Sequence, residues 1–224
     1  MQTQIYRLPL GFSTCYLVKQ EGLILVDTGT PNQAKKFLNE LKALSINPAD
    51  ISLILLTHGH WDHIGSANEI KRLTASKVAI NHREKDWVEQ AIKITPPGIS
   101  LWGSFLGMML KMLMPVVSFP GTSVDLALED SDFSLEPYGI SGQVLYTPGH
   151  SMGSMSLLLD TGEAFVGDSA MNGLPMRTGP GLPIFAEDMN AVKESWRLLL
   201  TRGAKQIYPA HGKPFEANIM ERFL

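Results

Sequence analysis

The chain has 224 residues, of which 44% are apolar, with 19 basic and 22 acidic side chains and a single cysteine, Cys15. One cysteine excludes an intrachain disulfide and a cysteine-rich zinc module, and the slightly acidic balance argues against a nucleic-acid partner, which normally meets a basic patch. The first residues lack the charged-then-apolar order of a secretory signal, so we expect no export and a cytoplasmic protein.

The first half of the chain alternates short β-rich runs with helical spacing. A hairpin is predicted across Gln20-Glu21-Gly22. A helix is predicted over residues 32–44, with Pro31 in its first turn. The apolar run over residues 51–56 is typical of a short strand buried on both faces. The predicted strands of this half are residues 14–19, 23–26, 51–56 and 77–80.

The second half continues the alternation. A helix is predicted over residues 189–201, with Asp188 as its N-cap, and Asp160-Thr161-Gly162-Glu163 predicts a hairpin turn. The predicted strands are residues 133–136, 143–146, 154–159, 164–166 and 206–208. Strands in both halves with helices between them predict a layered α/β or α+β fold in one domain, residues 1–224.

The stretch "LTHGHWDHIGS" at residues 56–66 holds three of the six histidines of the chain. His58, His60, Asp62 and His63 follow directly after the predicted buried strand. Imidazole is the commonest metal-binding side chain, and four titratable groups this close would repel or stay unsatisfied if they were buried without a cation. The stretch therefore predicts a metal site rather than a solvated loop.

This motif resembles the signature of the metallo-β-lactamase superfamily of metal-dependent hydrolases, in its glyoxalase II-like and lactonase-like branch. The other pieces of the family pattern are present: "LVDTGT" with Asp27, "YTPGHSMGS" with His150, "FVGDSA" with Asp168 and "IYPAHG" with His211. The resemblance covers about residues 14 to 213. It implies a four-layer αβ/βα sandwich, in which two mixed β-sheets are flanked by helices.

The resemblance also implies a binuclear metal site. The implied ligands are His58, His60 and His150 for one metal, Asp62, His63 and His211 for the other, and Asp168 between them. Nitrogen and oxygen ligands suit two zinc ions, with iron or manganese as alternatives. Asp62 is in addition the candidate catalytic proton shuttle. Asp27 is expected to orient ligands or simply to cap its own turn, and His82 is expected to be a surface histidine.

The most unusual segment is the apolar, methionine-rich insertion at about residues 96–121. Between Ile99 and Met114 only Lys111 is charged, but the run is interrupted by glycine and shorter than the roughly 20 apolar residues of a transmembrane span. Three interpretations remain open: a core helix, a lid that receives an apolar acyl or aromatic group, and a homodimer or membrane-surface contact. Under the second interpretation, Leu106 and Met109 would bind substrate.

From the implied ligands we expect a hydrolase that uses a metal-bridging hydroxide on a small ester, lactone or thioester with an apolar portion. Arg177, in the loop after Asp168, is a candidate contact for an anionic substrate group. Met171 stands where the best-known lactonases have a tyrosine, which argues against their particular chemistry. The alternatives are a phosphoesterase on the same site, a mononuclear iron oxygenase resembling persulfide dioxygenases, and a non-catalytic docking module.

Overall fold

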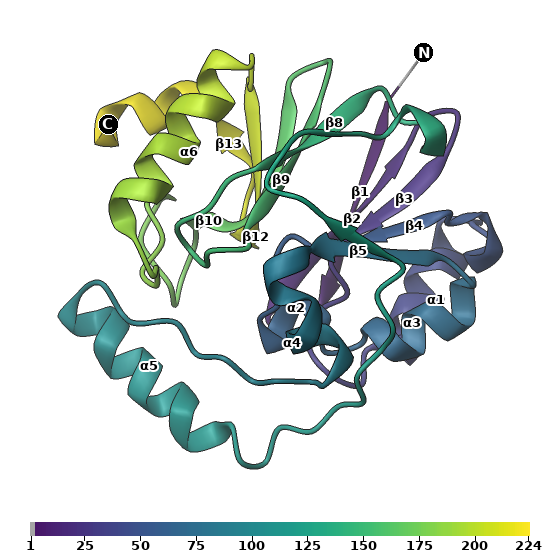
Figure 1. Ribbon diagram of the computed structural model, residues 1–224, viewed down its shortest axis with the longest axis horizontal. Coiled ribbons are helices and arrows are strands. Elements are labelled where there is room, and N and C mark those ends of the chain that lie inside the picture. The colour runs from purple at the N-terminus through teal and green to yellow at the C-terminus, as the bar shows by residue number, and fades with distance from the viewer. Residues whose placement is uncertain (1–2) are drawn as a thin grey trace.

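Two mixed β-sheets pack against each other in the computed structural model, which describes residues 3–224 (Figure 1). The first sheet has the order β1-β2-β3-β4-β5-β6. Strands β1 to β3 are antiparallel, and β3 to β6 are parallel. Its strands are β1 (Gln4–Leu10), β2 (Ser13–Lys19), β3 (Leu23–Val26), β4 (Leu53–Leu55), β5 (Lys77–Asn81) and β6 (Leu126–Leu128).

The second sheet has the order β13-β12-β10-β9-β8-β7, and β11 pairs with β10 outside this path. Only the β10–β12 pair among its described neighbours is parallel. Its strands are β7 (Phe133–Ser134), β8 (Gly142–Tyr146), β9 (Met155–Leu159), β10 (Glu163–Asn172), β11 (Pro180–Gly181), β12 (Gln206–Gly212) and β13 (Phe215–Glu216).

Helices cover the outer faces of both sheets. The α-helices are α1 (Ala34–Ala43), α2 (Trp61–Ile64), α3 (Ala67–Thr74), α4 (Lys85–Glu89), α5 (Leu101–Leu113) and α6 (Met189–Thr201). The 3-10 turns are η1 (Pro48–Asp50), η2 (His82–Glu84), η3 (Glu136–Tyr138) and η4 (Ala217–Phe223).

Three apolar clusters divide the molecule into four layers. One joins α1 and α3 to the first sheet and includes Phe37 and Ile70. The second lies between the sheets and includes Tyr16 and Phe165, and the third joins the second sheet to α6 through Trp196. The central strands β3, β4 and β9 are buried over their whole length because both faces of each strand are covered. The predicted αβ/βα sandwich is therefore confirmed.

Most predicted elements occur with shifted ends. Helix α6 has the predicted range, and the Asp188 side chain accepts hydrogen bonds from two N–H groups of its first turn. Helix α1 begins at Ala34, later than predicted, because Asn32 has a left-handed φ of 65° that no helix accepts. Strand β10 extends to Asn172, six residues past the predicted end at Val166, through irregular pairing around Gly167.

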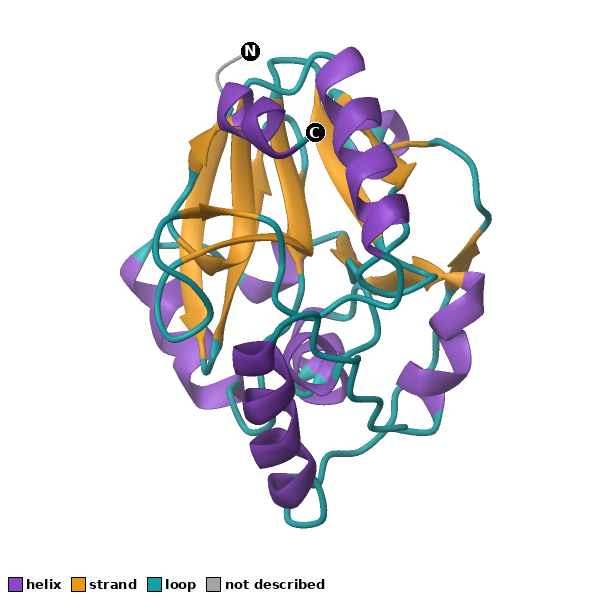
Figure 2. Cartoon of the chain, turned by 90° about the vertical axis from the view of Figure 1, so that its left-hand side faces the viewer, coloured by secondary structure: helices purple, strands orange, loops and turns teal. Residues whose placement is uncertain are grey.

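The methionine-rich insertion forms α5, which does not lie in the core. Figure 1 shows it at the lower left, joined to the sheets by two long irregular segments, and Figure 2 views the molecule from that side. Its only buried residues are Gly103 and Gly107, where a Cβ atom would meet Ile184 O at 2.5 Å and Phe185 Cε1 at 3.4 Å. The interpretation of this segment as a plain core helix is therefore wrong, because nine large apolar side chains between residues 99 and 116 remain exposed. They are Ile99, Leu101, Trp102, Phe105, Met108, Met109, Met112, Leu113 and Val116.

Within residues 3–224, no helix combines the length and the apolar composition that crossing a bilayer requires.

Candidate metal centre

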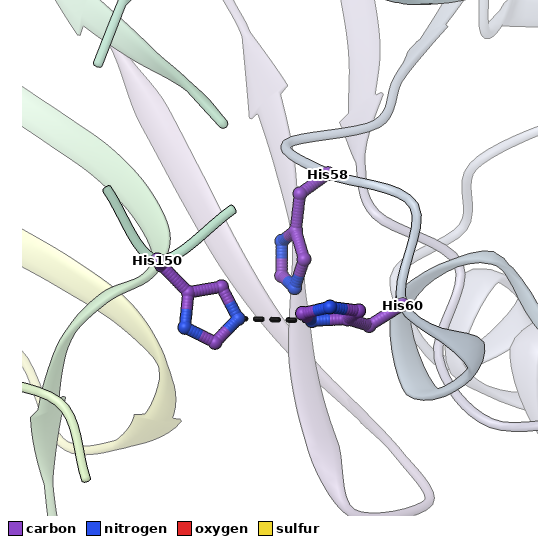
Figure 3. A group of neighbouring side chains, drawn as sticks. All are labelled: His58, His60 and His150. Atoms are coloured by element: carbon purple, nitrogen blue, oxygen red, sulfur yellow. Dashed lines mark hydrogen bonds between the residues drawn. The ribbon is translucent and has the colours of Figure 1, made fainter. Parts of the chain in front are cut away.

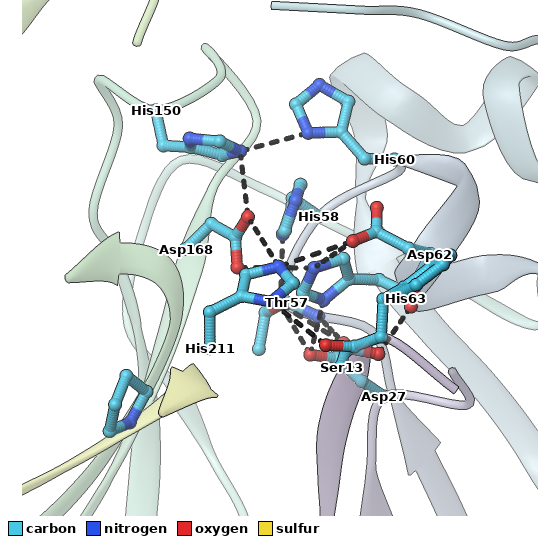
Figure 4. Close-up of polar contacts among 12 residues, drawn as sticks. Ser13, Asp27, Thr57, His58, His60, Asp62, His63, His150, Asp168 and His211 are labelled. Atoms are coloured by element: carbon cyan, nitrogen blue, oxygen red, sulfur yellow. Dashed lines mark hydrogen bonds and ion pairs between the residues drawn. The ribbon is translucent and has the colours of Figure 1, made fainter. Parts of the chain in front are cut away.

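The seven side chains that the sequence analysis named as implied metal ligands lie around one point at the edge between the two sheets (Figure 4). His58 and His60 follow the buried strand β4, and α2 carries Asp62 and His63. The second sheet supplies the remaining three side chains from the β8–β9 loop, β10 and β12: His150, Asp168 and His211. Each sheet thus contributes a share of the cluster, and the cluster forms only when the sheets pack together.

His58, His60 and His150 form a buried three-histidine group (Figure 3). Their ligand atoms lie within 4.8 Å of one another. His150 Nε2 and His60 Nδ1 are only 2.9 Å apart, and the His58 ring stands edge-on to the His60 ring. Three imidazoles facing one point are the donor set that zinc and other borderline cations prefer.

Asp62, His63 and His211 form a second group beside the first. Asp62 Oδ2 lies 3.2 Å from His211 Nε2 and 3.8 Å from His63 Nε2. The Asp168 carboxylate stands between the two groups: its oxygens lie 3.3 Å from both His63 Nε2 and His211 Nε2, and 3.7 Å from His150 Nε2. One carboxylate is therefore within reach of both groups.

Protein acceptors fix the outward nitrogens of these rings. Asp27 Oδ2 lies 2.9 Å from His63 Nδ1, and its carboxylate also accepts hydrogen bonds from the N–H and hydroxyl of Thr57. The carbonyl oxygens of Phe185 and Phe12 lie 2.9 Å and 3.1 Å from the Nδ1 atoms of His150 and His211. Such contacts leave Nε2 directed inward and raise the basicity of a ligand. Asp27 contacts the ligand region rather than capping its own turn.

Burial and mutual charge give the two groups opposite protonation. Burial, together with His150, lowers the pKa of His60 to about 3, and burial also lowers the pKa values of His58 and His150. Burial acts in the same direction on His211, but Asp168 and Asp62 outweigh it and raise the pKa of His211 to about 10. In the protein without metal, the first group is neutral, whereas the second holds a proton among carboxylates.

The unpaired atoms of the cluster fit a cation. Among the described residues, buried polar atoms without a hydrogen-bond partner include His58 Nε2, His60 Nε2, His63 Nε2 and Asp168 Oδ1. Buried polar atoms rarely lack a partner, and each such atom requires an explanation. The neutral rings of His58, His60 and His150 offer lone pairs beside the Asp168 carboxylate, and His60 faces this group with Nδ1, which lies 2.9 Å from His150 Nε2. A divalent cation would satisfy these atoms together, so the residues present fit a metal.

Metal binding to the second group at pH 7 is expected to release protons. His211 is protonated below its pKa of about 10, and only the neutral ring can coordinate a cation. The apparent zinc affinity of this group should therefore rise with pH until about pH 10, above which this proton no longer competes. Calorimetric titration of zinc in two buffers with different ionisation enthalpies measures the release, and an enthalpy independent of the buffer would contradict it.

A pocket of about 230 Å³ opens above the cluster. His60, Asp62, His150, Asp168 and His211 line its polar end. Its other walls are mainly apolar and include side chains of α5, of the β1–β2 turn and of the loop after β10: Phe12, Trp61, Ile94, Thr95, Pro96, Leu106, Leu110, Leu113, Pro175, Met176 and Phe185. The pocket is of the concave, mostly apolar type with a few converging polar groups that binds small molecules.

Two of the candidate substrate contacts do not line this pocket. Met109 faces solvent on the outer side of α5, with 47% of its surface exposed. Arg177 turns away, because its guanidinium donates to Leu182 O at 2.6 Å and lies 5.5 Å from the centre of the Phe223 ring. His82, which was expected to be a surface histidine, has a side chain that is 37% exposed and contacts the Leu128 carbonyl outside the cluster. Leu106 is the one proposed substrate contact that the structure places in the wall.

The aromatic walls were missed by sequence reasoning. Phe12 lies in the β1–β2 turn and is 69% exposed, while Trp61 packs edge-on against it with ring centroids 6.1 Å apart. An exposed aromatic residue in a tight turn is the one sequence signal that could have indicated Phe12. Phe185 lies in an irregular segment, and no sequence pattern indicated its position.

Comparisons with known proteins agree with this geometry. A family model described as the metallo-beta-lactamase superfamily matches residues 8–211. A probable metallo-hydrolase of Bacillus subtilis, YflN, is 32% identical over 152 residues, covering 66% of this chain and 55% of the relative. An N-acyl homoserine lactonase of Bacillus cereus is 25% identical over 171 residues, covering 66% and 58%. The chain thus aligns with little more than half the length of either relative.

Solved structures share the fold. The BLEG-1 B3 metallo-beta-lactamase superposes with a TM-score of 0.72 at 19% identity, covering 96% of this chain and 95% of that one. The archaeal protein ST1585 from Sulfolobus tokodaii superposes with a TM-score of 0.70 at 24% identity, covering 100% and 86%. At these identities the likeness establishes the architecture.

Proposed function

The chain belongs to the metallo-β-lactamase superfamily of metal-dependent hydrolases, and we propose that it uses two metal ions to hydrolyse a small neutral ester, lactone or thioester with an apolar portion. The observation that supports this is a single pocket whose polar end is the histidine–carboxylate cluster and whose walls are apolar. One end can activate water, and the other can hold an acyl group. The N-acyl homoserine lactonase among the relatives is consistent with a substrate of this kind.

In this proposal, the three-histidine group holds one ion, Asp62, His63 and His211 hold the other, and Asp168 is shared. Zinc suits this donor set of nitrogen and carboxylate oxygen. When bound, two divalent ions supply Lewis-acid activation of a water molecule and of the oxygen of the electrophile.

Asp62 is proposed to accept the proton of the attacking water. Its side chain is 14% exposed and lines the pocket, so it can reach both a water molecule and a substrate. Burial raises its pKa, but His63 and His211 outweigh burial, so the net shift is downward and the carboxylate is ionised at neutral pH. An ionised carboxylate at hydrogen-bond distance from water is competent as a general base. Asp27 orients His63 from behind through the Nδ1 contact.

The pocket walls favour a neutral acyl substrate over a phosphodiester. No lysine or arginine is among the residues that line the pocket in the described chain, although phosphate recognition usually relies on such side chains. An apolar wall instead gains free energy from each buried methylene, about 0.8 kcal/mol. The lining thus supports acyl substrates over the phosphoesterase alternative.

A substrate panel tests the proposal. Zinc-loaded protein should show its highest kcat/KM on neutral carboxylic esters, lactones or thioesters, with phosphodiesters far behind. A preference for phosphodiesters would favour the phosphoesterase alternative. One iron per chain with substrate-dependent oxygen consumption would favour the oxygenase, and zinc-loaded protein inactive on every class would contradict the proposal.

Leu106→Ser is expected to lower kcat/KM for esters with long acyl chains by about 10-fold or more, while acetyl esters change little. Leu106 lines the pocket, so a hydroxyl there leaves the acyl chain against an unpaired polar group. Met109→Ser is the matched control, three residues along α5 but on its solvent side. Kinetics over increasing acyl length measure the effect. Equal profiles for the two variants would exclude α5 as the acyl wall.

A further inference from the structure

Glu84 is a buried carboxylate that the proposed chemistry does not use. It is the last residue of η2, directly after β5, and only 1% of its surface is exposed. Carboxylates are almost never buried to this degree unless they are paired, so its partners identify its role.

Glu84 joins the two loops that carry the three-histidine group. Its Oε2 accepts a hydrogen bond from the N–H of Gly59 at 2.5 Å, and its Oε1 accepts one from the N–H of Gly153 at 3.0 Å. Gly59 lies between His58 and His60, and Gly153 follows His150 by three residues. One side chain thus ties a loop of the first sheet to a loop of the second.

Both loops are shaped around this carboxylate. A Cβ atom at Gly153 would lie 2.6 Å from Glu84 Cγ, and one at Gly59 would lie 3.2 Å from Glu84 Oε2 and 2.9 Å from Trp87 Cε3. Trp87, three residues after Glu84, stacks on the His60 ring with the planes 17° apart. The segment that carries Glu84 therefore supports the loop of His60 in two ways: Glu84 binds the backbone N–H of Gly59, and Trp87 packs against the His60 ring.

We propose that Glu84 is a positioning residue, which fixes His58 and His60 relative to His150 and thereby sets the metal affinity of the three-histidine group. The inference rests on the proposed function, in that this group binds a metal ion. His60 and His150 are 90 residues apart and come from different sheets, so their separation depends on how the two loops are held. Ligands fixed before the metal arrives bind it more tightly, because less freedom is lost on binding.

Glutamine at this position tests the charge and the double acceptor together. An amide has the size of the carboxylate but only one acceptor oxygen, so its NH₂ group would face one of the two backbone N–H groups. Glu84→Gln is introduced into two backgrounds that each retain one group: His211→Ala, which keeps the three-histidine group, and His150→Ala, which keeps Asp62, His63 and His211. Zinc affinity of the metal-free proteins is measured by competition with a chromophoric chelator, and cobalt absorption spectra report the ligand geometry.

The expected result is site-specific. Glu84→Gln should weaken zinc binding by about 10- to 100-fold in the His211→Ala background, with an altered cobalt spectrum, and should leave the affinity unchanged in the His150→Ala background. Glu89→Gln is the matched control, since Glu89 also accepts a backbone hydrogen bond, from Val124, but touches neither loop. Its zinc affinities should equal those of the parent proteins.

Two outcomes would overturn the role of Glu84: unchanged affinity in the His211→Ala background, or equal weakening in both backgrounds, which would indicate general destabilisation. If Glu84→Gln does not fold, Gly153→Ala provides the test in the same two backgrounds. Its added methyl group would displace the Glu84 side chain and should therefore weaken zinc binding only in the His211→Ala background. A wild-type chain that binds no zinc would instead overturn the proposed function itself, so the two failures are distinguishable.

Discussion

Asp168→Asn is expected to lower kcat on the best ester substrate by about 10²- to 10⁴-fold, since each metal ion supplies several kcal/mol of transition-state stabilisation. Asp168 is the carboxylate within reach of both groups, 3.3 Å from His63 and from His211 and 3.7 Å from His150. Asparagine keeps the size of the side chain but removes the negative charge that two neighbouring cations would share. Zinc bound per chain should fall from two to one or fewer.

Elemental analysis and steady-state kinetics measure this change together. Asp160→Asn is the matched control. Asp160 is an exposed aspartate in the turn between β9 and β10, it does not belong to the cluster, and its Oδ2 accepts a hydrogen bond from the Ser141 hydroxyl. Its activity and zinc content should match the wild type. An Asp168→Asn protein that retains two zinc ions and full kcat would show that this carboxylate is not shared by the metals.

Removing the metal is expected to abolish activity and to lower the Tm by about 5 to 11 °C per site. A ligand present at 100 times its Kd stabilises the native state by about 2.7 kcal/mol, and in a chain of this length 1 kcal/mol shifts the Tm by roughly 2 to 4 °C. The physical reason is that the cation joins side chains of both sheets, so its binding free energy opposes their separation.

Thermal unfolding with and without a chelator measures the shift, and added zinc should restore both the Tm and the turnover. Asp168→Asn serves as the internal control, because a protein that binds fewer ions has less to lose on chelation. An unchanged Tm with full activity after exhaustive chelation would contradict a metal-dependent mechanism for this chain.

The features that could be predicted from the residues alone are those whose parts lie close together in the sequence. His58, His60, Asp62 and His63 lie within six residues after an apolar strand, so their neighbourhood is fixed by covalent distance. His150, Asp168 and His211 were placed with them by resemblance to a family, and the structure lays them at the same sheet edge. Helix α6 was predictable to the residue because its cap and its apolar spacing agree.

Side-chain direction was not predictable, because it depends on packing between distant segments. Leu106 and Met109 are three residues apart on one helix, yet one lines the pocket and the other faces solvent. Arg177 was assigned to substrate from its position in a loop, but the Leu182 carbonyl and the Phe223 ring hold it elsewhere. Glu84 has no spacing signal, since its partners are backbone N–H groups 25 and 69 residues away.

Helix α5 belongs to a stretch of chain that lines the pocket but supplies none of the clustered side chains. None of the seven clustered side chains lies between residues 93 and 125, and this stretch contributes Ile94, Pro96, Leu106, Leu110 and Leu113 to the pocket wall. Connecting segments of this kind tolerate insertion and replacement. Under the proposed function, replacement of this helix would change which acyl groups are accepted, while the histidine–carboxylate cluster that is proposed to activate water would keep all of its residues.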